Sequence, residues 1–349
     1  MYKTFNFKNE TEELRIVHVT HNDLDAVGCD VIAELASNVD ARINIIETNF
    51  TDISEVNDTV NELLDRIVDG ELKTDMILIT DISVNNDTAA RLDDIANSNG
   101  IELVMLDHHI TNHLPEMYEW AQVVVRDGTE LVSATWAVYN YFKDVIGNYY
   151  PSLMDFAKSV SRYDTWEWKR NFEDGSEEDL NILFRMFHVT EASSVFVNII
   201  AENNFPVFMM PAYFEDIVEA YKYRREESLT HVVDNTVRTV FYDKNNKAYN
   251  VGIIIPHEEF FNAEMTFAYE QQPEMDFIIG LGPRKRTISL RTSKPDVNVG
   301  IIAKETFGGG GHAGAAGGQP GHPLFIELLT EYYDGMDGKV IPPIYSSID

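Results

Sequence analysis

The stretch IELVMLDHHI, residues 101–110, decides how this chain folds and where its chemistry lies. Residues 101–106 are an apolar run of strand length, and the run leads directly into Asp107, His108 and His109. One imidazole at the end of such a run is often a hydrogen-bonded core residue. Two imidazoles directly behind a carboxylate are more typical of a chemical site. The stretch therefore predicts a buried strand with functional side chains at its carboxyl end.

Two apolar runs upstream repeat this arrangement. LRIVHV (14–19) and DMILIT (75–80) are also strand candidates, and AVGCDVIAELAS (26–37) is one of the helical patterns that separate the strands. Near-continuous apolar strands that alternate with helices are typical of a parallel sheet covered on both faces. We therefore expect an α/β fold with an N-terminal parallel-sheet domain.

The predicted secondary structure changes twice in the second half of the chain. Helical patterns over 131–142 and 152–163 precede a polar, helix-friendly stretch, and a second α/β pattern starts near residue 236. Its strand candidates are TVRTVFY (236–242), NVGIIIP (250–256), DFIIGLG (276–282) and TISLRT (287–292), with helices expected around 258–270 and 297–306. We predict a catalytic domain over 1–185, a helical connector over 186–236 and a smaller α/β substrate-binding domain over 237–349, with the site facing the cleft between the domains.

The composition limits the classes of partner. The 58 acidic and 27 basic residues give a formal net charge of −31, which disfavours a long nucleic acid tracked along a basic groove. A local positive site could still hold a short anionic substrate. The single cysteine, Cys29, excludes an intramolecular disulfide framework, and no run is long enough to span a bilayer. We expect a cytoplasmic protein.

Acidic residues follow all three predicted strands. Asp23 and Asp25 follow the first strand, Asp81 the second and Asp107 the third. Each could be a helix cap or a turn residue, but the carboxyl ends of parallel strands meet at one edge, where these carboxylates would converge. Converging carboxylates repel one another unless cations lie between them, and the histidines favour Mn²⁺ over an all-oxygen Mg²⁺ or Ca²⁺ site. Two such ions are suited to phosphate ester hydrolysis.

The motifs together resemble those of the DHH phosphoesterase family with its C-terminal DHH-associated domain. The chain contains, in the family's order, HNDLDAVG (21–28), TDIS (80–83), LDHH (106–109), RYD (162–164), SLRTS (289–293) and FGGGGHAGAAGG (307–318). The first of these motifs is most similar to the oligoribonuclease branch. The resemblance covers about residues 15–318 and implies a metal-dependent phosphoesterase.

The resemblance also implies roles for particular residues. It makes Asp23 and Asp81 ligands of one ion, with Asp81 bridging to a second. The expected ligand set, with His21 included, is His21, Asp23, Asp25, Asp81, His108 and Asp164. The expected catalytic group is Asp107, His108 and His109, in which Asp107 orients its neighbours and His109 faces the substrate phosphate. Mn²⁺ is the expected metal, as two ions, with Mg²⁺ or Co²⁺ as alternatives.

One position departs from the family pattern. Many relatives have a ligand histidine four residues before the first aspartate of the opening motif, and that position is Val19 here. His21 is the better candidate to replace it, from the end of the strand, and His18 the weaker one. A structural role for His21 is the alternative.

The second domain is expected to hold the substrate. Glycines allow backbone N–H groups to approach a phosphate, and the resemblance assigns nucleotide or phosphate contacts to Arg291 and to Gly309, Gly310, Gly311 and His312. Arg284, Lys285 and Arg286 are explained equally well as a solvated turn. For Trp166 and Trp168, core packing is favoured over stacking on a base.

The predicted function is 3′-to-5′ hydrolysis of short oligoribonucleotides to mononucleotides. Alternatives within the enzyme class are linear or cyclic dinucleotide hydrolysis, phosphoadenosine-phosphate dephosphorylation and a long-strand DNA exonuclease. A nucleotide-binding sponge with an impaired metal centre is the alternative from another class. The expected partner is a short oligoribonucleotide or dinucleotide, no membrane is expected, and a homodimer remains open.

Overall fold

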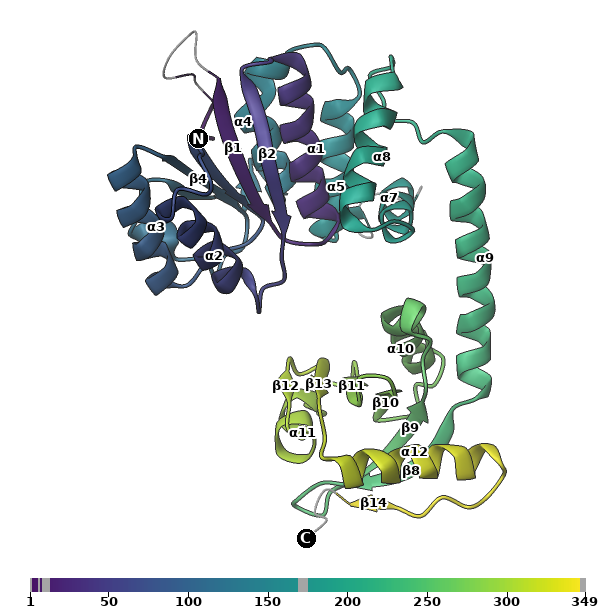
Figure 1. Ribbon diagram of the computed structural model, residues 1–349. Helices are drawn as coiled ribbons and strands as arrows, with labels where there is room; N and C mark the ends of the chain where they lie inside the picture. Colours follow the sequence, from purple (N-terminus) through teal and green to yellow (C-terminus); the bar gives the residue numbers. More distant parts are fainter. Residues whose placement is uncertain (1, 6, 8–12, 169–174, 346–349) are drawn as a thin grey trace. The chain divides into compact units, whose positions relative to one another are not determined.

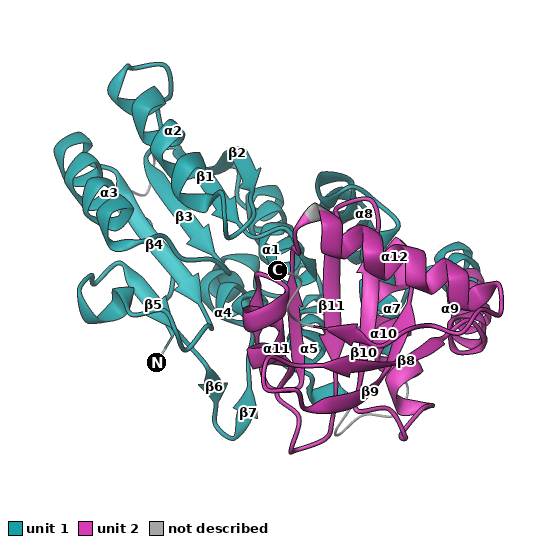
Figure 2. Ribbon diagram, turned by 90° about the horizontal axis from the view of Figure 1, so that it is seen from below, with its two compact units in different colours: residues 1–218 teal, residues 219–349 magenta. Residues whose placement is uncertain are grey.

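The structure is a computed structural model that describes residues 2–5, 7, 13–168 and 175–345. The chain divides into two compact units, residues 1–218 and 219–349 (Figure 2). Helix α9 (Ala212–Asp234) continues from the first unit into the second. Compact units are not functional domains, so the predicted three-part division of the chain stays a prediction.

Unit 1 is built on a five-stranded sheet (Figure 1). Its elements are β1 (Leu14–Thr20), α1 (Leu24–Val39), β2 (Ile43–Phe50), α2 (Val56–Val68), β3 (Met76–Thr80), α3 (Asn86–Asn99), β4 (Glu102–Asp107), the 3₁₀ turn η1 (Leu114–Glu116), β5 (Ala121–Val123), β6 (Arg126–Asp127), β7 (Glu130–Leu131), α4 (Ala134–Ile146), α5 (Leu153–Asp164), α7 (Ser176–Arg185) and α8 (Val189–Glu202). The strand order is β2-β1-β3-β4-β5, and all neighbours are parallel. The expected N-terminal parallel sheet is confirmed.

Helices cover both faces of this sheet, which explains the continuous apolar strands. Val17 and Val19 of β1 face α2 and α3 in one buried cluster. On the other face, α1 lies against β1 and β2 and α4 against β4 (Figure 1). His18 points to this second face because successive side chains of a strand alternate. The core of unit 1 is therefore apolar on one face and contains a buried histidine on the other.

Unit 1 differs from the sequence-based expectation in two respects. β2 joins the sheet and α2 packs against one of its faces, although the predicted three-strand pattern included neither element. α4 begins at Ala134, three residues later than expected, because residues 131–133 lead into its N-terminus from β7.

No helix among the described residues has both the length and the hydrophobicity that a membrane crossing requires.

Unit 2 is a mixed seven-stranded sheet, as expected for a second α/β domain. Its elements are β8 (Val237–Tyr242), β9 (Ala248–Ile254), the 3₁₀ turn η2 (Glu258–Phe260), α10 (Phe261–Glu270), β10 (Phe277–Gly282), β11 (Thr287–Arg291), α11 (Val299–Thr306), β12 (Gly310–Gly311), β13 (Ala315–Gly318), α12 (His322–Met336) and β14 (Ile344–Tyr345). The strand order is β12-β13-β11-β10-β9-β8-β14. One face packs against α11 and α12, and the other against α10 and the end of α9. The glycine-rich segment forms the edge strand β12 and its neighbour β13.

Candidate metal centre

The site begins where three parallel strands end. Thr20 of β1 is paired with Thr80 of β3, and Thr80 is paired with Leu106 of β4. The residues that follow these positions therefore emerge at one edge of the sheet. This register brings the opening motif, Asp81 and the Asp-His-His sequence together, as the sequence predicted.

Asp81 occupies an unusual backbone position at this edge. Its φ is 58°, in the left-handed region that aspartate tolerates better than most residues, and its N–H donates to the carbonyl of Leu106 at 3.1 Å. The side chain is buried, and its Oδ2 atom has no hydrogen-bond partner among the described residues. A buried carboxylate oxygen without a partner is costly, so Asp81 is suited to an added cation.

The two aspartates of the opening motif also hold helix ends. Asp23 is the N-cap of α1, with Oδ1 accepting from the N–H of Ala26 at 3.1 Å, while Oδ2 lies 3.0 Å from Nδ1 of His21. Asp25 is buried and accepts from the backbone N–H groups of Ala134 and Thr135, both at 2.9 Å. Asp25 therefore joins α1 to the N-terminus of α4, so the helix-cap interpretation of these aspartates is correct as far as it goes.

His108 lies at the centre of the acidic cluster. Its Nε2 atom is 3.4 Å from Oδ1 of Asp81, 3.4 Å from Oδ2 of Asp164 and 3.7 Å from Oδ2 of Asp25. Nε2 is buried and makes no hydrogen bond within the part of the chain that the structure describes. Four elements or their ends, α1, β3, β4 and α5, thus place ligand-type atoms around one point.

Asp107 organises the Asp-His-His sequence from within the core. Its Oδ1 accepts from the N–H groups of His108 and His109 at 2.7 and 3.2 Å and lies 2.8 Å from Nδ1 of His109. Its Oδ2 accepts from the side-chain amide of Asn112 at 2.7 Å. Asp107 is fully buried, and these contacts use both of its oxygens. The expectation that Asp107 orients its neighbours agrees with this geometry.

The electrostatics show how strongly the carboxylates repel one another without a cation. Burial, together with the charges of Asp25, Asp23 and Asp164, raises the pKa of Asp81 well above its usual range. Burial and the neighbouring charges also raise the pKa of Asp164 to about 8. A protein that ionises both groups at neutral pH needs a compensating positive charge between them.

Hydrogen bonds shift the pKa values of three further residues of the site. The hydrogen bond with Asp107 raises the pKa of His109, and the hydrogen bond with Asp23 raises that of His21. Burial alone would raise the pKa of Asp107, but the bonds with His109 and Asn112 outweigh burial and lower it. His109 therefore keeps its proton to a higher pH than a free imidazole, and Asp107 stays ionised to a lower pH than a free carboxyl group.

The donor atoms fall into three overlapping groups that could each hold a metal ion. Within each group the ligand atoms lie within 4.8 Å of one another. The groups are His21 with Asp23 and Asp81; Asp25 with His108 and Asp164; and Asp81 with Asp107, His108 and His109. The partnerless atoms Asp81 Oδ2 and His108 Nε2, together with this mixture of carboxylate and imidazole, fit a divalent transition-metal ion.

The structure distinguishes between His21 and His18 as the replacement for the ligand histidine that many relatives have at the position of Val19. Val19 and His18 are both fully buried. His18 lies 3.1 Å from Asp30 Oδ1 through Nδ1 and 2.8 Å from Thr80 Oγ1 through Nε2, so both ring nitrogens are occupied. Among the two candidates, only His21 belongs to a metal-type group of the described residues.

The predicted phosphate-binding residues lie in unit 2. A Cβ atom on Gly309 would lie 1.9 Å from the carbonyl oxygen of Gly317, and Gly311 has a φ of 142°, so the β12–β13 hairpin itself requires these two glycines. Gly310 has open space around its Cα, and His312 is exposed at the hairpin turn. The packing role of two of the glycines was not evident from the sequence.

Arg291 ends β11 and is half-buried. Its guanidinium donates to Ser289 Oγ and the Leu290 carbonyl, both at 2.9 Å, and to Asn262 Oδ1 at 3.0 Å. Burial lowers the pKa of this guanidinium. These three acceptors are neutral, so they hold the guanidinium in place without neutralising its charge.

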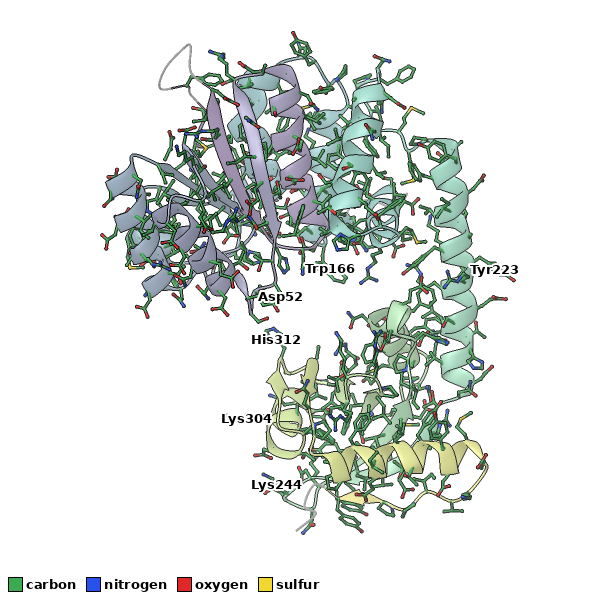
Figure 3. The ribbon with its side chains drawn as sticks, viewed as in Figure 1. Asp52, Trp166, Tyr223, Lys244, Lys304 and His312 are labelled. Atoms are coloured by element: carbon green, nitrogen blue, oxygen red, sulfur yellow. The ribbon has the colours of Figure 1, made fainter. Side chains whose placement is uncertain are left out.

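The two tryptophans after Asp164 differ from each other. Trp168 stacks on Tyr163 with ring centroids 5.7 Å apart. Trp166 is 59% exposed, has a φ of 62° and lies at the edge of unit 1 where β1 and β2 end (Figure 3). The expectation of core packing is therefore wrong for Trp166, whose side chain is mostly exposed.

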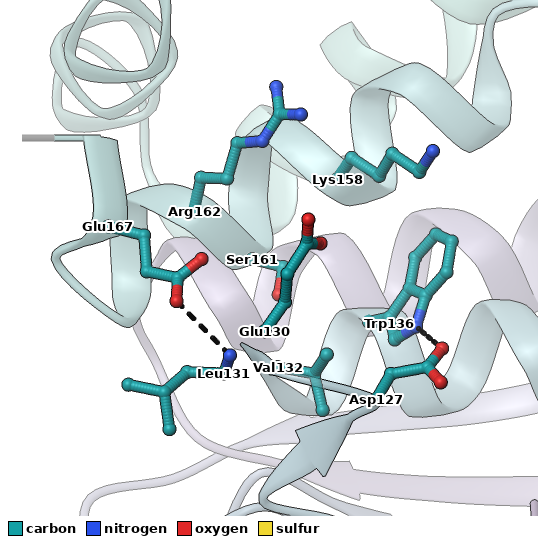
Figure 4. Close-up of a pocket in the computed structure, with 9 residues that line it drawn as sticks. All are labelled: Asp127, Glu130, Leu131, Val132, Trp136, Lys158, Ser161, Arg162 and Glu167. Atoms are coloured by element: carbon teal, nitrogen blue, oxygen red, sulfur yellow. Dashed lines mark hydrogen bonds between the residues drawn. The ribbon is translucent and has the colours of Figure 1, made fainter. Parts of the chain in front are cut away.

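A small polar pocket of unit 1 contains none of the predicted site residues (Figure 4). Its walls are held by their own contacts: Glu167 accepts from the N–H of Leu131 at 3.2 Å, and Trp136 Nε1 donates to Asp127 at 3.0 Å. Ser161, also in the wall, accepts from the N–H of Ser133 at 3.0 Å. The pocket thus adjoins the N-terminal end of α4, whose next two N–H groups bind Asp25.

Sequence reasoning missed two contributors to the site. Asn112 holds Asp107, and its position three residues after His109 is the only sequence signal that pointed to it. Asp52 follows the unpredicted strand β2, lies at the same edge (Figure 3), and its charge helps to raise the pKa of His21. The β-branched run INIIETNF (43–50) was the signal for that strand.

Comparison with known proteins gives one clear relative. No protein-family model matches the chain. The chain is 30% identical over 303 residues to oligoribonuclease NrnB of Bacillus subtilis (strain 168), covering 85% of this chain and 71% of that protein. Similar solved structures include the pGpG-specific phosphodiesterase PggH of Vibrio cholerae, at 14% identity and a TM-score of 0.49, covering 94% of this chain and 100% of that chain. Another is RecJ of Thermus thermophilus in complex with Mn²⁺, at 13% identity and a TM-score of 0.49, covering 95% of this chain and 53% of that chain.

Proposed function

Because this chain belongs to the DHH phosphoesterase family, as its identity to oligoribonuclease NrnB shows, we propose that it hydrolyses short oligoribonucleotides to mononucleotides. The observation that carries the proposal is the convergence of His108 Nε2 with the carboxylates of Asp81, Asp164 and Asp25 at one sheet edge. We include the 3′-to-5′ direction, a cytoplasmic location and the absence of a long nucleic-acid groove in this proposal.

Two divalent ions, Mn²⁺ in the first instance and Mg²⁺ or Co²⁺ as alternatives, would be held at this edge. His21, Asp23 and Asp81 would hold one ion, and Asp25, Asp81, His108 and Asp164 the other, with Asp81 shared. When bound, such ions lower the pKa of water and stabilise negative charge on a phosphoryl group. Asp23 and Asp25 each keep a helix-capping contact, which fixes their remaining lone pairs toward the site.

His109 would bind the substrate phosphate. Asp107 lies 2.8 Å from Nδ1 of His109 and raises its pKa, so the ring stays protonated to a higher pH than a free imidazole, and in that form Nε2–H is a second donor. The His109 side chain is half exposed, whereas Asp107 is buried. A positively charged donor beside the acidic cluster suits a phosphate oxygen, and Asn112 and Asp107 keep the ring in this orientation.

The distribution of charge supports unit 2 as the holder of the substrate's other groups. Unit 1 carries 40 acidic and 14 basic residues, whereas unit 2 carries 18 and 13. In unit 2, the half-buried Arg291 and the exposed His312 and Gly310 would contact a phosphate or a nucleotide. In unit 1, the exposed ring of Trp166 would stack on a base, a contact that tolerates any sequence.

The test is a time course with Mn²⁺ on end-labelled RNA: a dinucleotide, a pentanucleotide and a strand of about twenty-four nucleotides. Asp107→Ala/His108→Ala serves as the inactive comparison, and His113→Ala is a matched control because the exposed His113 ring pairs with Glu116, a residue outside the site. We expect rapid loss of the two short species with the wild-type protein and the control, and none with the double variant.

Other outcomes identify the alternatives. Equal or faster loss of the long strand indicates an exonuclease on long nucleic acid. Hydrolysis of cyclic dinucleotides or phosphoadenosine phosphate, with RNA left intact, moves the function within the family. Binding of nucleotides without hydrolysis, in protein that takes up no Mn²⁺, establishes the sponge and contradicts the proposal.

A further inference from the structure

A chain of polar side chains crosses the buried face of unit 1 and ends beside Asp81. Ser193 Oγ of α8 donates to Asp30 Oδ2 of α1 at 2.6 Å, and Asp30 Oδ1 lies 3.1 Å from Nδ1 of His18. His18 Nε2 lies 2.8 Å from Thr80 Oγ1, and Thr80 Oγ1 donates to Thr20 Oγ1 at 2.8 Å. We call these five residues the His18 network. All five are buried.

The His18 network is not what an ordinary core would contain. On the opposite face of β1, Val17 and Val19 pack in a cluster of apolar side chains from α2 and α3. A buried carboxylate–imidazole contact is weak evidence for stability, since well-packed apolar side chains are often at least as favourable. Burial would raise the pKa of Asp30, but the bond with His18 outweighs it and lowers that pKa. The network therefore contains the ionised carboxylate of Asp30 within the core, and stability alone does not account for it.

The His18 network reaches Thr80, directly before the metal-centre residue Asp81. Thr80 is the last residue of β3, and the next residue, Asp81, has the left-handed φ of 58° and a buried Oδ2 without a partner. Such a conformation persists only where the surroundings hold it. On one side the Asp81 N–H is held by the Leu106 carbonyl. On the other side, the residue before it is held by His18 through its side chain.

We propose that His18 is a positioning residue for the metal centre, which anchors Thr80 and thereby holds Asp81 in the orientation that a shared metal ligand requires. The inference rests on the proposed function only in that a divalent ion binds at Asp81. It gives the histidine of β1 a role one position away from the usual ligand position, Val19, without contact to the ion. Partners that orient ligands in this way typically contribute about 10- to 100-fold to metal affinity.

Two amides at position 18 separate the two ring contacts. The side-chain amide of His18→Asn can reach the position of Nδ1 and keep Asp30 paired, but it cannot reach Thr80. The longer His18→Gln can reach the position of Nε2 and keep the Thr80 contact. Thr80→Val removes the same contact from the other side with nearly unchanged shape. Thr48→Val is the matched control, because Thr48 donates to Asp30 Oδ1 at 2.8 Å at the far side of the network from Thr80.

The measurement is Mn²⁺ affinity by calorimetric titration, together with the thermal unfolding of each metal-free variant. We expect His18→Asn and Thr80→Val to bind Mn²⁺ about 10- to 100-fold more weakly, and His18→Gln and Thr48→Val to stay within a few-fold of the wild type. His18→Asn and Thr80→Val proteins that unfold earlier yet bind Mn²⁺ as the wild type does would show a purely structural role and overturn the inference. A wild-type protein that binds no Mn²⁺, Mg²⁺ or Co²⁺ would instead contradict the proposed function.

Discussion

The carboxylate of Asp25 accepts a hydrogen bond of 2.9 Å from the backbone N–H of Thr135, while its other oxygen lies 3.7 Å from Nε2 of His108. One buried side chain thus caps α4 and faces the acidic cluster. We expect Asp25→Asn to abolish Mn²⁺-dependent hydrolysis and also to lower the free energy of unfolding by about 1–2 kcal/mol, because the amide keeps one acceptor oxygen and leaves the second buried N–H without an acceptor. Urea unfolding of the metal-free protein measures the second effect.

Asp164→Asn is the matched comparison for Asp25→Asn. Asp164 also faces His108, at 3.4 Å, but repulsion and burial raise its pKa to about 8. Replacing it should abolish metal-dependent hydrolysis without destabilising the metal-free protein. Equal destabilisation by both substitutions would contradict the assignment of the capping role to Asp25.

The raised pKa values predict how the stability of the metal-free protein depends on pH. Asp164 titrates near pH 8 in the folded protein but near its ordinary value of 3.8 when unfolded, so between these values the folded state binds the additional proton. The free energy of unfolding must then fall as the pH rises through this window. The raised pKa values of Asp81 and His109 act in the same direction, whereas the lowered pKa of Asp107 removes stability only at acid pH.

The measurement is thermal unfolding in EDTA from pH 5 to pH 8. We expect the midpoint to decrease across this range, to decrease less in Asp164→Asn, and to decrease less with saturating Mn²⁺, which binds the ionised carboxylates. An EDTA midpoint that rises over the same range would show that these carboxyl groups do not share one buried cluster.

Gly28 tests the contact between α1 and α4. An alanine in a helix normally stabilises by about 1 kcal/mol relative to glycine. Here the added Cβ atom would lie 2.2 Å from Thr135 Oγ1, so Gly28→Ala should instead destabilise, by about 1–3 kcal/mol, the usual cost of overpacking. Thr135→Ala removes the clashing atom, and the double variant should recover part of the loss. Additive losses in this double-mutant cycle would mean that the two residues are not in contact.

Arg291 separates substrate binding from metal binding. Its guanidinium is held by three neutral acceptors. A hydrogen bond from a charged group to phosphate contributes about 1.5–3 kcal/mol, so its loss corresponds to roughly a 10- to 100-fold increase in KM. We expect this increase for Arg291→Ala on a dinucleotide, with unchanged Mn²⁺ affinity. Arg286→Ala, in the exposed turn before β11, is the control and should leave KM unchanged. An effect of equal size in both variants would favour a diffuse charge effect over a specific contact.

The sequence alone was sufficient for the parts of the site that depend on local pattern. The apolar run 101–106 and its two counterparts predicted parallel strands, and parallel strands bring their carboxyl ends to one edge. This is why His108 and Asp81 could be placed together in advance. β2 was not anticipated, because its residues are half-buried at the edge of the sheet and lack the continuous apolar run.

Tertiary structure decided what each polar side chain does, because hydrogen-bond partners come from remote parts of the chain. Asp25 caps α4 over a separation of 110 residues, and His18 is taken up by Asp30 and Thr80, so it is not available as a ligand. Gly309 is required by a carbonyl of the opposite strand and not only by a ligand. The residue types and their order determined the sheet and the chemistry of its edge, whereas three-dimensional packing determined which atoms remain without partners and can bind an ion.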